Sequence, residues 1–138
     1  MKQLAPSILS ADFICLGEQL KQLQKLCIHY LHIDVMDGMF VPSISFGMPV
    51  IASLRKHTDM FFDVHLMIEE PIRYVNALRQ AGADGLTVHA EACADLPGTI
   101  AAIRESGAKP AVCLSPKTPL SKLDGILDQV DMVLIMGV

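Results

Sequence analysis

The alternation of short apolar runs with segments of helical spacing constrains the fold of this chain more than any other feature. Leu16, Leu20, Leu23 and Cys27, for example, recur along one stripe of a helix. We predict six strands, at residues 4–9, 30–36, 61–67, 85–89, 111–115 and 132–138. We predict five helices between them, at residues 16–27, 49–56, 71–81, 97–105 and 119–127.

Strands that alternate with helices indicate an α/β fold with one parallel sheet and right-handed crossovers. Gly82 and Gly107 close two of the helices and lie 25 positions apart, which is the length of one βα unit. No linker divides the chain, so we interpret residues 1–138 as a single domain. A closed barrel of eight βα units typically needs about 250 residues. We therefore expect an incomplete (β/α)8 TIM barrel with six strands and five helices.

Composition and charge argue against two classes of partner. The chain holds 11 Lys and Arg against 15 Asp and Glu, and the net charge of −4 offers no basic surface for nucleic acid. Hydrophobic residues make up 51% of the chain, yet no apolar run approaches the roughly 18 residues of a membrane helix. Four cysteines without a CxxC pair, and an N-terminus without signal-peptide character, predict a cytoplasmic location.

The second predicted strand carries His32, Asp34 and Met36 on one face, because residues two apart on a strand point to the same side. The next strand repeats this placement with His65 and Met67. In parallel α/β folds the carboxyl ends of the strands form the active site. The alternative for His32 and Asp34 is a hydrogen-bonded core histidine beside an aspartate that caps a turn.

Further strands bring similar residues to the same edge. The fourth strand ends at His89, with Glu91 two positions later, and the sixth places Met136 at its end. Three histidines should then converge on one mouth of the sheet. Two histidines and a carboxylate form a plausible ligand set for Zn²⁺, Fe²⁺ or Mn²⁺. The methionines are either ordinary core residues or a polarizable lining beside a charged intermediate.

Two segments near this mouth have a structural and a functional interpretation. Ser7, in the first predicted strand, would point inward and hydrogen-bond a substrate hydroxyl, although a serine there is more often a turn or cap residue. Residues 38–47 form a long apolar loop that suits a lid over the site, with glycines at both ends. Loop packing explains these glycines equally well.

Several linked motifs resemble the ribulose-phosphate 3-epimerase family, in order and across all 138 residues. They are Ala5-Pro-Ser-Ile-Leu-Ser-Ala-Asp12, His32-Ile-Asp-Val-Met-Asp-Gly38, Phe40-Val-Pro42, Ser45-Phe-Gly47, His65-Leu-Met67, Thr87-Val-His-Ala-Glu91, Leu114-Ser-Pro-Lys-Thr-Pro119 and Val133-Leu-Ile-Met136. The resemblance implies a ribulose-phosphate-binding barrel that interconverts ribulose 5-phosphate and xylulose 5-phosphate at C3. Allulose 6-phosphate is the alternative substrate.

By this resemblance one divalent metal ion, Zn²⁺, Fe²⁺, Mn²⁺ or Co²⁺, would be bound by His32, Asp34 and His65. Asp34 would also be the proton acceptor, and Ser7 and His65 would contact substrate. The space beside the reacting carbons would be lined by Met36, Met67 and Met136. The reaction passes through a metal-stabilised cis-enediolate, and inversion needs a carboxylate on each side of its plane.

The family's second acid/base and its phosphate-binding loops follow the sixth strand, so we expect both to be absent from this chain. A catalytically inactive remnant, or a self-associating module, is therefore the rival interpretation. The resemblance also implies a homo-oligomer that takes a small sugar phosphate as its substrate. Three positions depart from the family pattern, since Ser43 and Ser115 replace asparagine and Gly137 replaces threonine.

Overall fold

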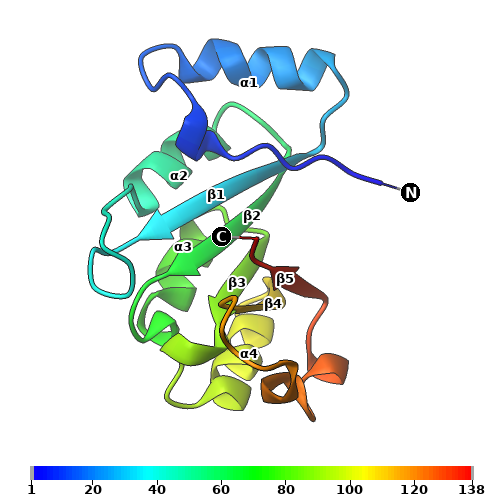
Figure 1. Ribbon diagram of the computed structural model, residues 1–138. Helices are drawn as coiled ribbons and strands as arrows, with labels where there is room; N and C mark the ends of the chain where they lie inside the picture. The colour runs from blue at the N-terminus through cyan, green and yellow to red at the C-terminus, as the bar shows by residue number, and fades with distance from the viewer. Residues whose placement is uncertain (1, 138) are drawn as a thin grey trace.

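The computed structural model describes residues 2–137 and contains one parallel sheet in the order β1-β2-β3-β4-β5 (Figure 1). The strands are β1 (Tyr30–Met36), β2 (Phe61–Met67), β3 (Gly85–His89), β4 (Lys109–Leu114) and β5 (Met132–Ile135). Each strand pairs with the next one along the chain, which is the order expected of a barrel wall. The predicted parallel α/β sheet is confirmed.

Within residues 2–137, α1 (Leu16–Lys25) precedes β1, and three α-helices connect successive strands from β1 to β4: α2 (Met48–Arg55), α3 (Val75–Ala81) and α4 (Leu96–Glu105). In Figure 1, α1 lies at the β1 end of the sheet and α4 at the β4 end. Asp95 caps α4 by accepting a hydrogen bond from the Gly98 backbone, and Gly82 ends α3 in the left-handed conformation, with φ of 119°. No helix within residues 2–137 has the length and apolar character needed to cross a membrane.

The two faces of the sheet have different roles. Along β1, Leu31, Ile33 and Val35 are buried in the core that packs against the helices. The residues between them, His32 and Asp34, therefore face the other side, which is concave. A cavity on this side is lined by residues from β1, β2 and β5, so the sheet curves like part of a cylinder.

The prediction of a first strand at residues 4–9 is wrong. Ser7 forms only an isolated parallel bridge with His32, and a 3₁₀ turn follows at Ile8–Ser10. Pro6 has no N–H to donate, and the Ser7 hydroxyl accepts the Leu9 N–H at 3.2 Å, so this segment turns instead of extending the ladder. The sheet thus has five strands rather than six. The last strand ends at Ile135, and Val138 lies outside the described residues.

The prediction of a helix at residues 119–127 is also wrong. Two short 3₁₀ turns, Leu120–Leu123 and Leu127–Gln129, occupy this region. Between them Gly125 adopts φ of 73°, a left-handed conformation that interrupts the helical path. The part of the chain that the structure describes therefore contains four α-helices, not five. The structure still fits an incomplete barrel, with five strands and four α-helices among the described residues instead of the six and five predicted.

Arg55 joins the end of α2 to the loops that lead into β2 and β3. Its guanidinium lies 3.7 Å from the centre of the Phe62 ring. It donates hydrogen bonds to the carbonyl oxygens of Thr58 at 2.7 Å, Met60 at 2.5 Å and Gly82 at 3.1 Å, and to Asp84 Oδ2 at 2.8 Å. A Cβ at Gly82 would lie 2.6 Å from the Arg55 side chain, so glycine is required there for a second reason.

Candidate metal and proton-transfer site

Adjacent strands β1 and β2 bring His32, Asp34 and His65 together, as the sequence predicted. Asp34 is in register with His65 across the parallel pair. The carboxylate Oδ1 of Asp34 lies 3.2 Å from His32 Nε2 and 3.1 Å from His65 Nδ1. Donor atoms of all three residues lie within 4.8 Å of one another. Two imidazoles and a carboxylate at this spacing suit a divalent cation of borderline softness.

Asp34 is held as an anion by its neighbours. Burial alone would raise the pKa of this carboxyl, but hydrogen bonds with His32, His65 and Ser7 lower its pKa far below the ordinary value. Ser7 Oγ donates to Asp34 Oδ2 at 2.5 Å. The isolated bridge between Ser7 and His32 fixes this hydroxyl next to the carboxylate. Ser7 thus orients Asp34, and it does not line the cavity described below.

Asp63 is a member of this group that the sequence interpretation missed. It is buried on β2, and its Oδ2 lies 2.8 Å from His32 Nδ1. Burial acts to lower the pKa of His32. The hydrogen bonds of His32 with Asp34 and Asp63 outweigh this effect and raise the pKa to about 9. Strand alternation could have predicted this position, because Asp63 lies two residues before His65 and therefore points to the same face of the sheet.

Replacing Asp63 with asparagine is expected to weaken metal binding at His32 by about 10- to 100-fold. A carboxylate on the outer nitrogen of a metal-ligating histidine fixes the ring and raises its basicity, and loss of such a partner costs this much. Isothermal titration calorimetry with Mn²⁺ measures the change in metal affinity. The exposed Asp128→Asn variant is the control for the same chemical change, and equal affinities for the two variants would contradict the role given to Asp63.

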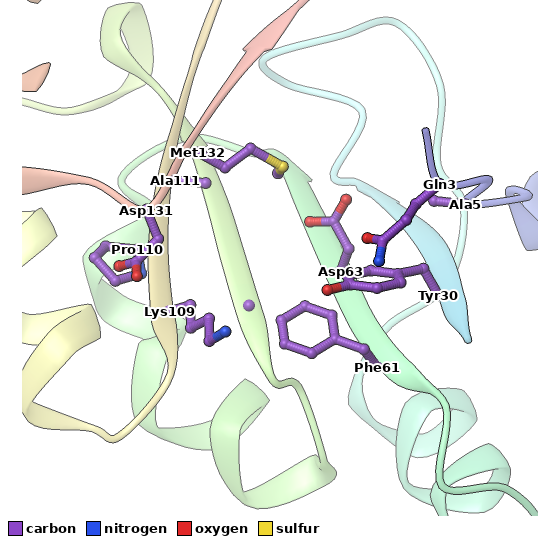
Figure 2. Close-up of a pocket in the computed structure, with 11 residues that line it drawn as sticks. Gln3, Ala5, Tyr30, Phe61, Asp63, Lys109, Pro110, Ala111, Asp131 and Met132 are labelled. Carbon is purple, nitrogen blue, oxygen red and sulfur yellow. The ribbon is translucent and has the colours of Figure 1, made fainter. Parts of the chain in front are cut away.

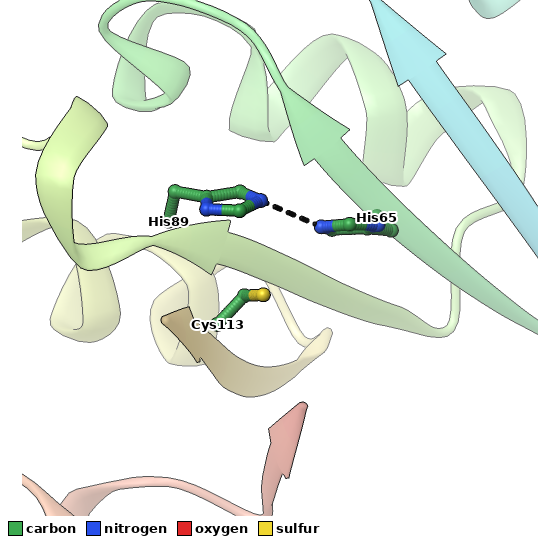
Figure 3. A group of neighbouring side chains, drawn as sticks. All are labelled: His65, His89 and Cys113. Carbon is green, nitrogen blue, oxygen red and sulfur yellow. Dashed lines mark hydrogen bonds between the residues drawn. The ribbon is translucent and has the colours of Figure 1, made fainter. Parts of the chain in front are cut away.

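The third predicted histidine, His89 on β3, also joins the group. The ring centroids of His65 and His89 lie 5.0 Å apart, and those of His32 and His65 lie 5.6 Å apart. The Nε2 atoms of His65 and His89 are 2.9 Å apart, and a dashed line in Figure 3 marks this hydrogen bond. Cys113 on β4, which is paired in register with His89, adds a buried thiol beside them. No role for Cys113 was predicted from the sequence.

The predicted methionine lining is brought together by the curvature of the sheet. Met36, Met67 and Met136 border one cavity of about 290 Å³, together with Asp34 and His65. Among residues 2–137, Asp34 is the only carboxylate that lines this cavity. The cavity is mostly apolar at the carboxyl ends of the strands, where α/β enzymes bind their substrates.

The loop at residues 38–47 is anchored rather than free. Asp37 Oδ1 accepts the N–H groups of Met39 and Phe40, both at 2.9 Å, and its Oδ2 accepts the Glu69 N–H at 2.8 Å. These bonds tie the loop after β1 to the loop after β2. The Phe40 ring lies 4.8 Å from the His89 ring, centroid to centroid, so the loop packs against His89.

A second cavity, of about 370 Å³, lies at the opposite ends of the strands (Figure 2). Tyr30, Phe61 and Lys109, which begin β1, β2 and β4, form its wall. Figure 2 shows the Asp63 carboxylate at this cavity, which makes Asp63 the link between the two ends. Catalytic residues in such folds lie at the carboxyl ends of the strands, so we assign no catalytic role to this cavity.

Comparison with known proteins places the sequence in a family. The family model described as "Ribulose-phosphate 3 epimerase family" matches residues 3–138. Ribulose-phosphate 3-epimerase of Bacillus subtilis (strain 168) is 51% identical over 138 residues, covering 100% of this chain and 64% of that protein. The chloroplastic ribulose-5-phosphate-3-epimerase of Arabidopsis thaliana is 48% identical, covering 98% of this chain and 49% of the relative. The chain thus spans less than two thirds of either relative.

Solved structures share the fold at low sequence identity. Tryptophan synthase subunit alpha from Legionella pneumophila str. Paris has a TM-score of 0.65 at 17% identity, covering 98% of this chain and 62% of its own. A mutant of the tryptophan synthase alpha-subunit from Pyrococcus furiosus has a TM-score of 0.69 at 14% identity, with 96% and 64% covered. These likenesses support the arrangement of strands and helices alone. On the family model and the identities, the chain belongs to the ribulose-phosphate 3-epimerase family.

Proposed function

We propose that this chain carries the metal-binding and first proton-transfer part of an enzyme that interconverts ribulose 5-phosphate and xylulose 5-phosphate at C3. One observation supports this above the others. The ionised Asp34 carboxylate lies beside His32 and His65, at the edge of an apolar cavity at the carboxyl ends of the strands. We propose a (β/α)8 barrel for the whole enzyme, of which residues 2–137 supply the five strands described.

His32, Asp34 and His65 would hold one divalent ion, and the donor set is compatible with Zn²⁺, Fe²⁺, Mn²⁺ or Co²⁺. When bound, such an ion supplies Lewis-acid polarisation of the substrate oxygens next to C3. Asp63 supports this arrangement because it holds the outer nitrogen of His32 at 2.8 Å. The ring of His32 therefore has one orientation toward Asp34.

Asp34 would take the C3 proton. A proton acceptor must be ionised at neutral pH, and the hydrogen bonds that lower the pKa of Asp34 meet this condition. Ser7 keeps one carboxylate oxygen in place by donating its hydroxyl hydrogen. Met36, Met67 and Met136 would keep water away from the reacting carbon, since their side chains surround the cavity that Asp34 enters.

Inversion at C3 needs an acid on the side of the carbon opposite to Asp34. Two other carboxylates lie near the histidines, and neither lines the cavity: Asp63 is paired with His32 Nδ1, and Glu91 accepts the Ser115 N–H at 2.8 Å. Residues 2–137 therefore supply one of the two proton-transfer groups. We propose that the second group comes from a part of the enzyme outside these residues.

Isotope exchange tests this proposal on the 138-residue polypeptide. With Mn²⁺ and saturating ribulose 5-phosphate in D₂O, we expect deuterium to enter C3 without accumulation of xylulose 5-phosphate. Proton NMR follows the loss of the C3 signal, and allulose 6-phosphate is the comparison substrate. Absence of exchange would overturn the role of Asp34. Full epimerisation would show that a second acid lies within this chain.

We propose two further properties of the chain. The edge strand β5 leaves Ile135 exposed, which favours self-association with a second copy, and sedimentation velocity measures it. All four cysteines are unpaired, which supports a reducing compartment such as the cytoplasm.

A further inference from the structure

His65, His89 and Cys113 form a separate cluster on the concave face of the sheet, one residue from each of β2, β3 and β4 (Figure 3). Their donor atoms lie within 4.8 Å of one another. All three side chains are buried, with exposed fractions of 3%, 1% and 0%. We propose that this cluster is a second metal site, selective for a thiophilic divalent cation such as Zn²⁺, and distinct from the site of His32 and Asp34.

Each imidazole points its Nδ1 at a carboxylate and its Nε2 at the other imidazole. His65 Nδ1 faces Asp34 Oδ1 at 3.1 Å, and His89 Nδ1 faces Glu91 Oε2 at 3.3 Å. An ionised carboxylate only accepts, so each Nδ1 donates and each Nε2 carries a lone pair. These two lone pairs meet at 2.9 Å, where they repel unless a proton or a metal ion lies between them.

The carboxylates also match the outer shell of known metal sites. A histidine that ligates a metal commonly donates its other N–H to a carboxylate, which fixes the tautomer and raises the basicity of the ligand. Asp34 does this for His65, and Glu91 does it for His89. Glu91 is itself held by the Ser115 N–H at 2.8 Å. The cluster therefore has both an inner set of ligands and the outer set that would orient them.

The third ligand is the Cys113 thiol. Its only hydrogen bond in the described structure is a weak one, from Sγ to the Leu114 carbonyl oxygen at 3.7 Å. Tetrahedral Zn²⁺ with Zn–N bonds of about 2.0–2.1 Å holds two ligand nitrogens about 3.3 Å apart. The pair of Nε2 atoms would have to open by about 0.4 Å from 2.9 Å to reach that spacing. Binding releases the thiol proton to solvent, because the ligand is the thiolate.

The two sites share one residue but use different atoms of it. His65 presents Nδ1 to Asp34 and Nε2 to His89. A neutral imidazole has a single lone pair, so it ligates a metal through one nitrogen at a time. A cation at the cysteine site and a cation at the Asp34 site therefore compete for His65. Thiolate selects Zn²⁺ or Co²⁺, whereas Mn²⁺ prefers the carboxylate-containing set.

Cobalt titration distinguishes this site from the one in the proposed function. With the polypeptide kept reduced and free of oxygen, Co²⁺ is expected to produce a thiolate-to-cobalt charge-transfer band in the near ultraviolet. The band should be lost in Cys113→Ser and in His89→Asn, and retained in His32→Asn. Cys93→Ser is the matched control, because Cys93 lies near His89 but outside the cluster, and it should also retain the band.

The readouts separate the two hypotheses. Circular dichroism establishes that each variant is folded, and His89→Asn gives a second variant that keeps all four thiols. A band that persists in Cys113→Ser, or no band in the unchanged chain, would overturn the second site. The proposed function is read independently in the unchanged chain, by Mn²⁺-supported exchange at C3. Exchange without a cobalt band therefore overturns only this inference, and a band without exchange supports it.

Discussion

Replacing Asp34 with asparagine is expected to slow Mn²⁺-supported deuterium exchange at C3 of ribulose 5-phosphate by about 10²- to 10⁴-fold. A positioned general base contributes a factor of this size, and the amide has no basic oxygen of comparable strength. The substitution also removes the anion that His32 and His65 contact at 3.2 and 3.1 Å, so the metal site is weakened as well. Exchange is followed by proton NMR at saturating substrate and metal.

The control for Asp34→Asn is the same change at Asp128, an exposed residue within the 3₁₀ turn Leu127–Gln129. Asp128→Asn should exchange at the rate of the unchanged chain. Thermal unfolding of each variant shows that it is folded at the assay temperature. An Asp34→Asn variant that is folded, loaded with metal and still retains more than a tenth of the exchange rate would remove Asp34 from its proposed role.

The second large effect is on stability. Arg55→Met is expected to lower the free energy of unfolding by about 2–4 kcal/mol, because three backbone carbonyls and Asp84 would lose a charged donor. The Arg55 side chain is only 26% exposed, so solvent replaces these bonds incompletely. Methionine retains most of the apolar length that packs on Phe62. The loss therefore reports the hydrogen bonds more than the packing.

Urea denaturation measures this loss, and two comparisons make it specific. Arg55→Lys keeps the charge but not the planar fork of donors, so it should recover only part of the stability. Arg104→Met removes an arginine whose side chain is 56% exposed, and it should cost less than about 1 kcal/mol. Equal losses for Arg55→Met and Arg104→Met would contradict the role of Arg55 as a link between α2 and the strands.

The sequence predicted the part of the site that depends on strand period. The side chains of His32, Asp34 and Met36 share a face because residues on a strand alternate, and parallel pairing then brings His65 and Met67 to the same edge. Family membership was accessible for the same reason, since its motifs are short and lie within single strands or their loops. These features are local, or follow from one pairing rule.

The wrong predictions concern segments where a turn or an interaction between distant residues outweighs the local pattern of apolar residues. Residues 4–9 have an apolar pattern, but Ser7 caps a 3₁₀ turn in preference to continuing a strand. Residues 119–127 have helical spacing, but Gly125 interrupts it with a positive φ. Cys113 was missed because its place beside His89 depends on the register of β3 against β4, which only the fold specifies.

The alternation along β1 also determines how the chain can diverge under selection. Leu31, Ile33 and Val35 are buried in the core, while the adjacent His32 and Asp34 are proposed metal ligands, so neighbouring positions are constrained by different requirements. A population of variants scored for both abundance and catalysis would show losses of abundance at the first set and losses of catalysis without loss of abundance at the second. The strand therefore lets the proposed site residues be exchanged without rebuilding the core behind them.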